Sequence, residues 1–207
     1  MNSSYFITGI GTGIGKTIAA AVLVQYFRAD YWKPIQSGDL DNSDSICVRR
    51  LVDQDLYIHK ERYRLNFPAS PHQSAEMDGI QIRLADFQLP RTTNSLLVEG
   101  AGGLFVPFNQ NEFMIDMIEK FNIPIILVIR DYLGCINHTL LSLAAIQQRK
   151  LPLAYVVFNG PFVPETKRML LAQLPPRVIW IEIPELADLN RREIKRLADN
   201  LQINFKR

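Results

Sequence analysis

Cysteine, net charge and long apolar runs are all scarce in this 207-residue chain. Its two cysteines, Cys47 and Cys135, cannot form a disulfide framework, and no Cys-x-x-Cys or Cys/His cluster suggests a zinc site. The net charge of +2 gives no case for binding nucleic acid or an anionic membrane surface. The longest strongly apolar run, residues 123–129, is far too short to span a bilayer.

The chain also begins without a basic region ahead of an apolar stretch, so no signal peptide is expected. We therefore expect a cytoplasmic protein with neither nucleic acid nor a membrane as its partner. Length and composition, with 47% hydrophobic and 21% charged residues, suit one domain over residues 1–207. The somewhat basic stretch 191–207 is interpreted as the solvated face of a terminal helix rather than as a binding patch.

Short apolar, β-branched runs alternate with helical patterns along the whole chain. Most runs are nearly continuous, which is typical of parallel strands covered on both faces. Strands are expected at residues 5–8, 31–33, 95–98, 124–129, 154–158 and 178–182. Helices are expected at residues 16–27, 44–51, 112–120, 137–148, 165–173 and 191–200. This order predicts a doubly wound α/β fold with a mainly parallel sheet and helices on both faces, and ligands beyond the carboxyl ends of the strands. The least regular segment, 53–89, is expected to hold small helices and loops over one sheet edge.

A glycine-rich loop, residues 9–17, joins the first expected strand to an Ala-rich helix and ends in Gly-Lys-Thr. Glycines let backbone N–H groups turn toward an anion, and the helix N-terminus adds a favourable dipole. Lys16 can reach the β- and γ-phosphates, and the Thr17 hydroxyl can ligate Mg²⁺. Ile10 stands where a plain phosphate loop has its first glycine. The loop nevertheless predicts a P-loop NTPase-like fold that binds ATP through Gly13, Ile14, Gly15, Lys16, Thr17 and Ile18.

Other polar residues follow the second and third expected strands. Lys33 leaves a strand toward the carboxyl edge and can meet an anion, although alone it would be interpreted as a surface lysine. Asp44 begins a helix after Asn42 and Ser43, where an N-cap role for one of those two is the ordinary interpretation and metal ligation by Asp44 is the alternative. Glu99 caps an apolar strand and is placed to hold Mg²⁺; Gly100, Ala101 and Gly102 after it allow a ligand close to the backbone.

Three later segments are weaker candidates. A helix start at 134–137 can accept a carboxylate. A nucleophilic pair of Cys135 and His138 is less favoured than a packed cysteine beside a histidine near the helix cap, because no third orienting group is present. Asn159 and Gly160 end a strand where an amide could read a nucleobase, and residues 184–186 could line the same base pocket.

In order, these pieces resemble the dethiobiotin synthetase family over nearly the whole chain. The most specific runs are Glu-Gly-Ala-Gly-Gly at 99–103 and Leu-Gly-Cys-Ile-Asn-His at 133–138, and the spacing around Ile10 is a family trait. The other matching runs are the 9–17 loop, Lys33-Pro34 with Ser37-Gly38, Asn42-Ser43-Asp44 and Ser70-Pro71-His72.

The resemblance implies an ATP- and Mg²⁺-dependent ligase of biotin biosynthesis. It would close the ureido ring of dethiobiotin from 7,8-diaminononanoate and CO₂ (or bicarbonate) through a carbamic–phosphoric anhydride. Lys33 and Lys16 would be catalytic, Thr17, Asp44 and Glu99 would hold Mg²⁺, and Thr12 and Ser37 would touch the diamine or carbamate. The nucleotide would also contact Gly100, Ala101, Gly102, Asn159, Gly160, Pro184, Glu185 and Leu186. In a homodimer, Gly134, Cys135, Ile136 and Asn137 would bind the substrate carboxylate near the interface.

The chain departs from the family at three positions. Gly11 and Gly13 stand where the loop of relatives carries acidic residues, and Tyr132 stands where a lysine often precedes Leu-Gly-Cys. Two alternatives share this ATPase core. Amide-forming synthetases of corrin synthesis need a glutaminase domain, for which 207 residues leave no room. Partition- or Min-type ATPases carry an extra lysine early in the loop, at the position of Gly11.

Overall fold

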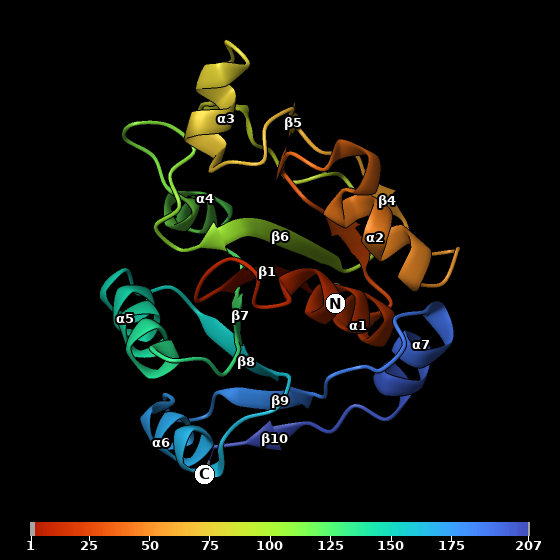
Figure 1. The fold of residues 1–207 in the computed structure, drawn as a ribbon, viewed down its shortest axis with the longest axis vertical. Coiled ribbons are helices and arrows are strands. Elements are labelled where there is room, and N and C mark those ends of the chain that lie inside the picture. The colour runs from red at the N-terminus through yellow and green to blue at the C-terminus, as the bar shows by residue number, and fades with distance from the viewer. Residues whose placement is uncertain (1–2, 207) are drawn as a thin grey trace.

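The computed structural model describes residues 3–206, and these form a central sheet with helices on both faces (Figure 1). In this part of the chain the sheet has eight strands in the order β10-β9-β8-β7-β1-β6-β2-β4. All neighbours pair in parallel except β10, which is antiparallel to β9. The bounds are β1 Ser4–Gly9, β2 Asp30–Trp32, β4 Ile58–His59, β6 Leu96–Gly103, β7 Ile125–Ile129, β8 Leu153–Asn159, β9 Ile179–Ile183 and β10 Asn204–Phe205.

The central strands are buried on both faces, as their continuous apolar runs predict. All five residues of β7 are buried, and β1 lies between β6 and β7. The parallel register pairs Ile7 with Glu99 on β6 and Gly9 with Val128 on β7. The carboxyl ends of these strands therefore meet at one edge of the sheet.

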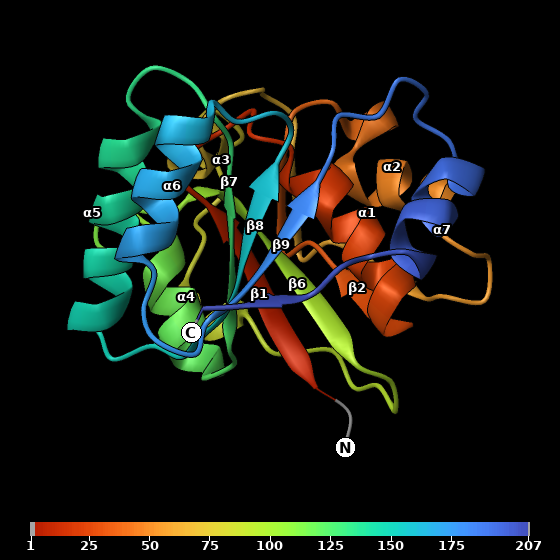
Figure 2. The same cartoon turned by 90° about the horizontal axis from the view of Figure 1, so that it is seen from below.

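Two helical layers cover the sheet, and Figure 2 shows one on each side. The layer of α1, α2 and α7 packs tightly, and α1 is buried along most of its length between the sheet and the other two helices. The opposite layer consists of α4, α5 and α6. The bounds are α1 Lys16–Phe27, α2 Asp44–Leu51, α4 Met114–Phe121, α5 Cys135–Gln148, α6 Pro164–Gln173 and α7 Arg191–Asp199.

A smaller subregion lies beyond the β2 side of the sheet. Its two short parallel strands, β3 (Ile35–Ser37) and β5 (Tyr63–Leu65), form a separate sheet beside helix α3 (Pro71–Met77). Single 3₁₀ turns, η1 (Leu40–Asn42) and η2 (Leu84–Asp86), complete it. Figure 1 shows α3 at the top of the molecule, beyond helix α4.

The doubly wound α/β prediction is confirmed, and the six expected strands and six expected helices all occur. Most bounds shift by one or two residues, and four features differ further. Strand β6 continues to Gly103 instead of ending near Val98, because its glycine-rich half still pairs with β1. The segment 53–89 holds strands β4 and β5 in addition to small helices. Strands β3 and β10 were not predicted; they have three and two residues. No helix within residues 3–206 is long and apolar enough to cross a membrane.

The amino end of β2 is fastened by a buried carboxylate. Asp30 is 3% exposed and accepts hydrogen bonds from Thr92 Oγ1 at 2.5 Å and Asn94 Nδ2 at 3.0 Å. The Nε2 atom of His59, on edge strand β4, lies 3.4 Å from Asp30 Oδ2. Burial alone would raise the pKa of Asp30, but these hydrogen bonds and His59 hold it below its ordinary value.

We predict that Asp30→Ala lowers the free energy of unfolding by about 2 kcal/mol at pH 7, because it removes the buried acceptor of the hydrogen bonds from Thr92 and Asn94. The folded pKa lies below the unfolded one, so this contribution is present above about pH 4 and disappears as the pH falls through the folded pKa. Urea unfolding of both proteins at several pH values measures the difference. The exposed Asp188→Ala variant is the control, and an equal, pH-independent loss in both variants would contradict the prediction.

Candidate active site

A pocket of about 730 Å³ opens at the carboxyl ends of β1, β2 and β6. It collects most of the predicted site residues from distant parts of the chain. Those that line it are Thr12, Gly13, Gly15, Lys16, Thr17, Ile18, Lys33, Ser37, Asp44, Glu99, Ala101 and Gly102. This position is the one expected for a ligand site in an open α/β sheet.

Two hydrogen bonds brace the phosphate loop, one from within it and one from β8. Lys16 Nζ donates to the Gly11 carbonyl at 2.7 Å, and Asn159 Nδ2 donates to the Ile14 carbonyl at 2.7 Å. Gly15 caps α1 with a φ of 83°, a left-handed conformation in which a side chain would overlap Asn159. The loop thus turns into α1 with its free N–H groups and the helix N-terminus at the pocket, as anion binding requires.

Two carboxylates and one ammonium group form the floor of the pocket. Lys33 Nζ donates to Glu99 Oε1 at 3.1 Å and forms an ion pair with Asp44. The Thr17 hydroxyl is 2.8 Å from Asp44 Oδ1 and 3.1 Å from Glu99 Oε1. Lys33 and Glu99 are 5% and 1% exposed, so their charges interact with little screening by water.

The two lysines respond to this environment in opposite directions. Burial alone would lower the pKa of Lys33, but Glu99 and Asp44 raise it above its ordinary value. The pKa of Lys16 is lowered to about 8, mainly by burial; Glu99 and Asp44 oppose this shift, and the charge on Lys33 adds to it. Lys33 is therefore firmly charged within the protein. Lys16 is the less compensated cation, and an added anion such as phosphate would stabilise its charge.

The structure settles two alternatives raised by the sequence: whether Lys33 is a surface lysine, and which residue caps α2. Lys33 is not a surface lysine, because it is almost wholly buried. Ser43 is the N-cap of α2, since its side chain accepts a hydrogen bond from the Ile46 N–H at 3.4 Å. That cap leaves Asp44, the first helical residue, free to face Lys33 and Thr17.

Several lining residues were not predicted. Most come from the subregion of β3, β5 and α3, namely Ile35, Gln36, Asp39, Pro68, Ala69, Ser70 and Pro71, and Val106 comes from the segment after β6. The Ser70-Pro71-His72 run was a signal for this wall, but no role was attached to it. The Ser37 hydroxyl is buried at the pocket and has no hydrogen-bond partner among the described residues. An unsatisfied hydroxyl of this kind suits a polar substrate group.

The residues predicted at the nucleobase lie at the ends of β8 and β9, outside the lining of this pocket. Asn159 is 5% exposed, and the Gly160 N–H donates to the Ile183 carbonyl at 2.7 Å. Glu185 pairs with Arg130 at 3.0 Å, and the Arg130 guanidinium also lies beside Gly160. The assignment of Asn159, Gly160, Pro184, Glu185 and Leu186 to a nucleobase stays a prediction.

The start of α5 is also separate from the pocket. Cys135 is 2% exposed, and its thiol donates to Asp131 Oδ1 at 3.4 Å. His138 instead meets the Tyr132 hydroxyl through Nδ1 at 2.7 Å. These contacts favour the packed cysteine over a Cys/His nucleophile pair. The Tyr132 hydroxyl lies close to the phosphate loop: its oxygen is 3.9 Å from the position that a Cβ of Gly11 would occupy.

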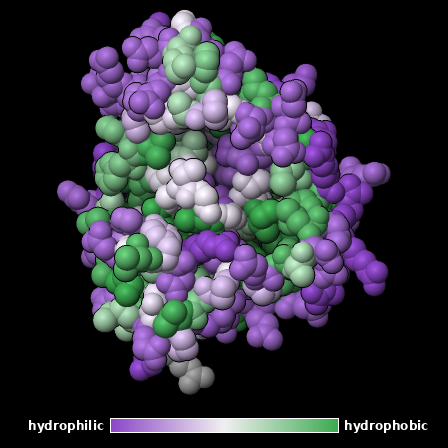
Figure 3. All heavy atoms as spheres, in the orientation of Figure 1, coloured by the Kyte–Doolittle hydropathy of each residue, from purple (hydrophilic) through white to green (hydrophobic). Residues whose placement is uncertain are grey.

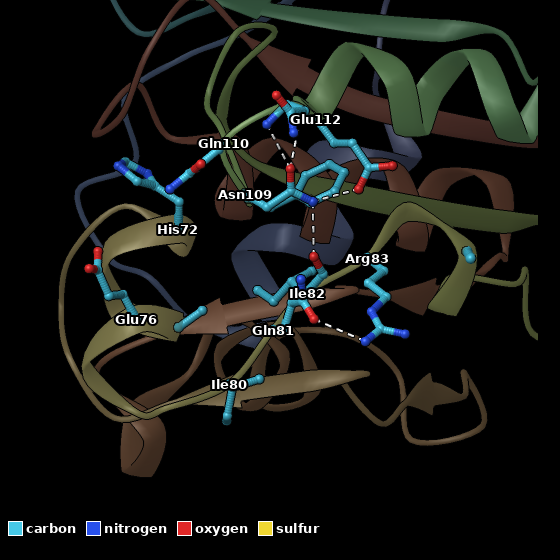
Figure 4. Close-up of a pocket in the computed structure, with 13 residues that line it drawn as sticks. His72, Glu76, Ile80, Gln81, Ile82, Arg83, Asn109, Gln110 and Glu112 are labelled. Carbon is cyan, nitrogen blue, oxygen red and sulfur yellow. Dashed lines mark hydrogen bonds between the residues drawn. The ribbon is translucent and has the colours of Figure 1, made fainter.

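A second pocket, of about 760 Å³, lies between α3 and residues 108–112 (Figure 4). Its polar groups mainly satisfy one another. Asn109 Nδ2 donates to the Ile82 carbonyl at 2.9 Å and to Glu112 Oε2 at 2.5 Å, while Glu112 also accepts from the Leu84 N–H. It contains none of the phosphate-loop, lysine or carboxylate residues described above. We therefore place the active site in the first pocket.

The fold and the first pocket define a phosphate-loop ATPase. A family model described as an AAA domain (AAA_26) matches residues 3–193. A ParA family ATPase from Chlorobium tepidum shares the fold alone, with a TM-score of 0.50 and 10% identity over 96% of this chain and 98% of that one. The chain belongs to the family of ATP-dependent dethiobiotin synthetases, a group of ATP-using ligases. The Christiangramia forsetii member is 48% identical over 81% of each chain, and the Brucella ovis member is 47% identical over 77% of this chain and 76% of its own.

A substitution at Gly38 can test the pocket wall that comes from the β3, β5 and α3 subregion. Its φ is +70°, and an added Cβ would lie 2.5 Å from Pro68 Cα. Gly79 has a similar φ of +66° but nothing within 4 Å of its Cβ position. Both alanine variants incur the left-handed backbone cost of about 1–2 kcal/mol, but only the one at Gly38 must displace the wall.

We therefore predict that Gly38→Ala lowers kcat/KM for dethiobiotin formation at least about tenfold, while the Kd for ATP changes less than about twofold. Gly79→Ala is expected to keep kcat/KM close to that of the unchanged protein. Steady-state turnover and equilibrium nucleotide binding measure the two quantities. Equal losses in the two variants would show that backbone strain alone explains the effect.

Proposed function

We propose that this chain, as a single domain over residues 1–207, converts 7,8-diaminononanoate, CO₂ and ATP into dethiobiotin, ADP and phosphate. The observation that carries the proposal is the buried Lys33, held between Asp44 and Glu99 beside the phosphate loop. Such a cation next to a triphosphate site suits the transfer of a phosphoryl group to an anionic acceptor. Because the reaction consumes ATP, we expect the enzyme to work in the cytoplasm, where ATP is available.

The reaction proceeds in three steps. One amine of the diamine attacks CO₂ and loses a proton, which forms a carbamate. A carbamate oxygen then attacks the γ-phosphorus of ATP, ADP leaves, and a carbamic–phosphoric anhydride results. The second amine attacks the carbamate carbon, phosphate leaves with the C–O bond electrons, and a further proton is released as the cyclic urea closes.

The residues of the pocket are suited to these steps. Lys16 would contact the β- and γ-phosphates, and Lys33 would offset the charge that gathers on the carbamate and the transferred phosphoryl group. Thr12 and Ser37 line the same pocket and would hydrogen-bond the diamine or carbamate. Because Lys33 is fixed by two carboxylates, it can act without reorganisation as charge develops.

Thr17, Asp44 and Glu99 would hold Mg²⁺. Their oxygens stand together, with the Thr17 hydroxyl 2.8 Å and 3.1 Å from the two carboxylates, and hard oxygen donors are the ligands that Mg²⁺ prefers. The described residues contain no group of three His, Cys, Asp or Glu side chains able to hold a metal alone, so phosphate oxygens and water would complete the coordination. When bound, Mg²⁺ neutralises charge on the phosphates.

The nucleotide would extend from the phosphate loop toward the ends of β8 and β9. Ile14, Ile18 and the 100–102 glycine-rich segment would border it, and Asn159 would meet the base beside Gly160. Asn159 already touches the Ile14 carbonyl, so one side chain links the phosphate loop to this region. Residues 184–186 would form the outer wall of the base site.

We also propose a homodimer that places the start of α5 at the interface. Leu133 is 104% exposed, and Tyr132 and Leu141, in the same part of the chain, are also exposed. Hydrophobic residues gather over α5 on the left of the molecule in Figure 3. Burying this apolar surface against a second copy would favour association. Gly134, Cys135, Ile136 and Asn137 would then present helix N–H groups to the substrate carboxylate near the interface.

The direct test is dethiobiotin formation by the purified protein with ATP, Mg²⁺, bicarbonate and 7,8-diaminononanoate, measured by mass spectrometry. We expect product in a one-to-one ratio with phosphate. ATP binding without any product would overturn the proposed function. ATP hydrolysis stimulated by DNA instead would indicate a partition-type ATPase.

In the same assay, Lys33→Met tests whether the charge on Lys33 is needed for turnover. Methionine keeps the chain length but removes the charge, so we expect turnover to fall at least about a hundredfold with the Kd for ATP changed less than about fivefold. Lys60→Met, at an exposed position, is the control for loss of one lysine. Near-normal turnover of Lys33→Met would contradict its catalytic role.

For the dimer, we predict that Leu133→Asp shifts the protein to monomer in sedimentation velocity, because a charge would be buried at the interface. Turnover should fall with it, while ATP binding by the separate phosphate loop remains. Leu189→Asp is the control, since Leu189 is 50% exposed on the loop before α7. A Leu133→Asp protein that stays dimeric would disprove the location of the interface.

A further inference from the structure

The core beneath the pocket contains a polar atom that the mechanism above does not use. Tyr31 lies in the middle of β2, is 0% exposed, and donates its phenolic hydrogen to Glu99 Oε2 at 2.9 Å. The β2–β6 register pairs it with Leu97, two residues before Glu99 on the neighbouring strand. Tyr31 is not among the residues that line the pocket, so its buried hydroxyl reaches the carboxylate from within the core.

The two oxygens of Glu99 have different partners. Oε1 accepts from Lys33 Nζ at 3.1 Å and from the Thr17 hydroxyl at 3.1 Å, on the side of the pocket. Oε2 accepts from Tyr31 on the buried side. A carboxylate bound only at Oε1 could still rotate about its last carbon–carbon bond. Bonds to both oxygens fix the plane of the group and leave Oε1 facing the phosphate loop.

We propose that Tyr31 is a positioning residue that orients Glu99 toward the Mg²⁺–nucleotide complex. The inference rests on the proposed function, since it concerns the carboxylate expected to face Mg²⁺. A phenylalanine would fill the same space without burying a hydroxyl, so packing alone does not account for the tyrosine. The hydroxyl acts through Glu99 and does not contact the substrate itself.

A purely structural tyrosine would behave differently. Its hydroxyl would add stability by satisfying a buried carboxylate oxygen, and its removal would weaken folding without altering the response to Mg²⁺. Tyr155 provides that comparison in the same protein. It is 9% exposed, lies on β8, and shares a side-chain hydrogen bond with Tyr5 away from the pocket.

The test is Tyr31→Phe, with Tyr155→Phe as the matched control. Calorimetric titration with ATP is carried out over a range of Mg²⁺ concentrations and without Mg²⁺. For Tyr31→Phe we expect the Mg²⁺ concentration that half-maximally enhances ATP binding to rise about tenfold, as for other residues that support metal ligands. Without Mg²⁺ its ATP affinity should stay within about twofold. Tyr155→Phe should lower the melting temperature and leave the Mg²⁺ response unchanged.

An unchanged Mg²⁺ response in a folded Tyr31→Phe protein would overturn the proposal. A double-mutant cycle adds a second criterion: in a Glu99→Gln background, Tyr31→Phe should have no further effect on the Mg²⁺ response. An undiminished effect there would show that Tyr31 does not act through Glu99. These binding measurements need no diamine, so failure of the unchanged protein to make dethiobiotin would be seen separately as failure of the proposed function.

Discussion

The buried contact of Lys33 with Glu99 and Asp44 is the interaction on which the site depends. Each charge alone would be costly in the interior, and together they offset one another. The three residues come from the end of β2, from β6 and from the first turn of α2, so the contact exists only when sheet and helix are both in place. The catalytic groups are thereby held by the same interactions that satisfy the buried charges.

Strand register explains how such distant residues meet. Parallel pairing of β1 with β6 sets Ile7 opposite Glu99, and the phosphate loop begins two residues further on, at Gly9, the last residue of β1. Pairing of β2 with β6 then directs the end of β2, and Lys33 after it, toward the same place. A slip of one residue would turn Glu99 to the other face of the sheet and separate it from Thr17.

Local patterns allowed prediction of much of this arrangement. The bounds of α1 and α2 match the expectation: Gly15 and Ser43 cap their N-termini, and the left-handed Arg28 and the extended Val52 follow their last residues. Features that depend on pairing between distant segments are harder to predict from the sequence. The glycine-rich end of β6 has little strand propensity, and its register with β1 shifts before Gly103 pairs with Gly9. The wall from Pro68 onward and the hydroxyl of Tyr31 gave little local signal, since their roles depend on which strands become neighbours.

The unusual spacing of the phosphate loop has a physical explanation in this sheet. Ile10 is 9% exposed, and its N–H donates to the Val128 carbonyl at 3.2 Å, which extends the contact between β1 and β7 by one residue. A glycine there would leave the core without that side chain. The chain therefore leaves the sheet one residue later than in a plain phosphate loop, and the turn falls to the glycines that follow. Anchoring by Ile10 on one side and Asn159 on the other lets a loop without acidic side chains at Gly11 and Gly13 keep its shape.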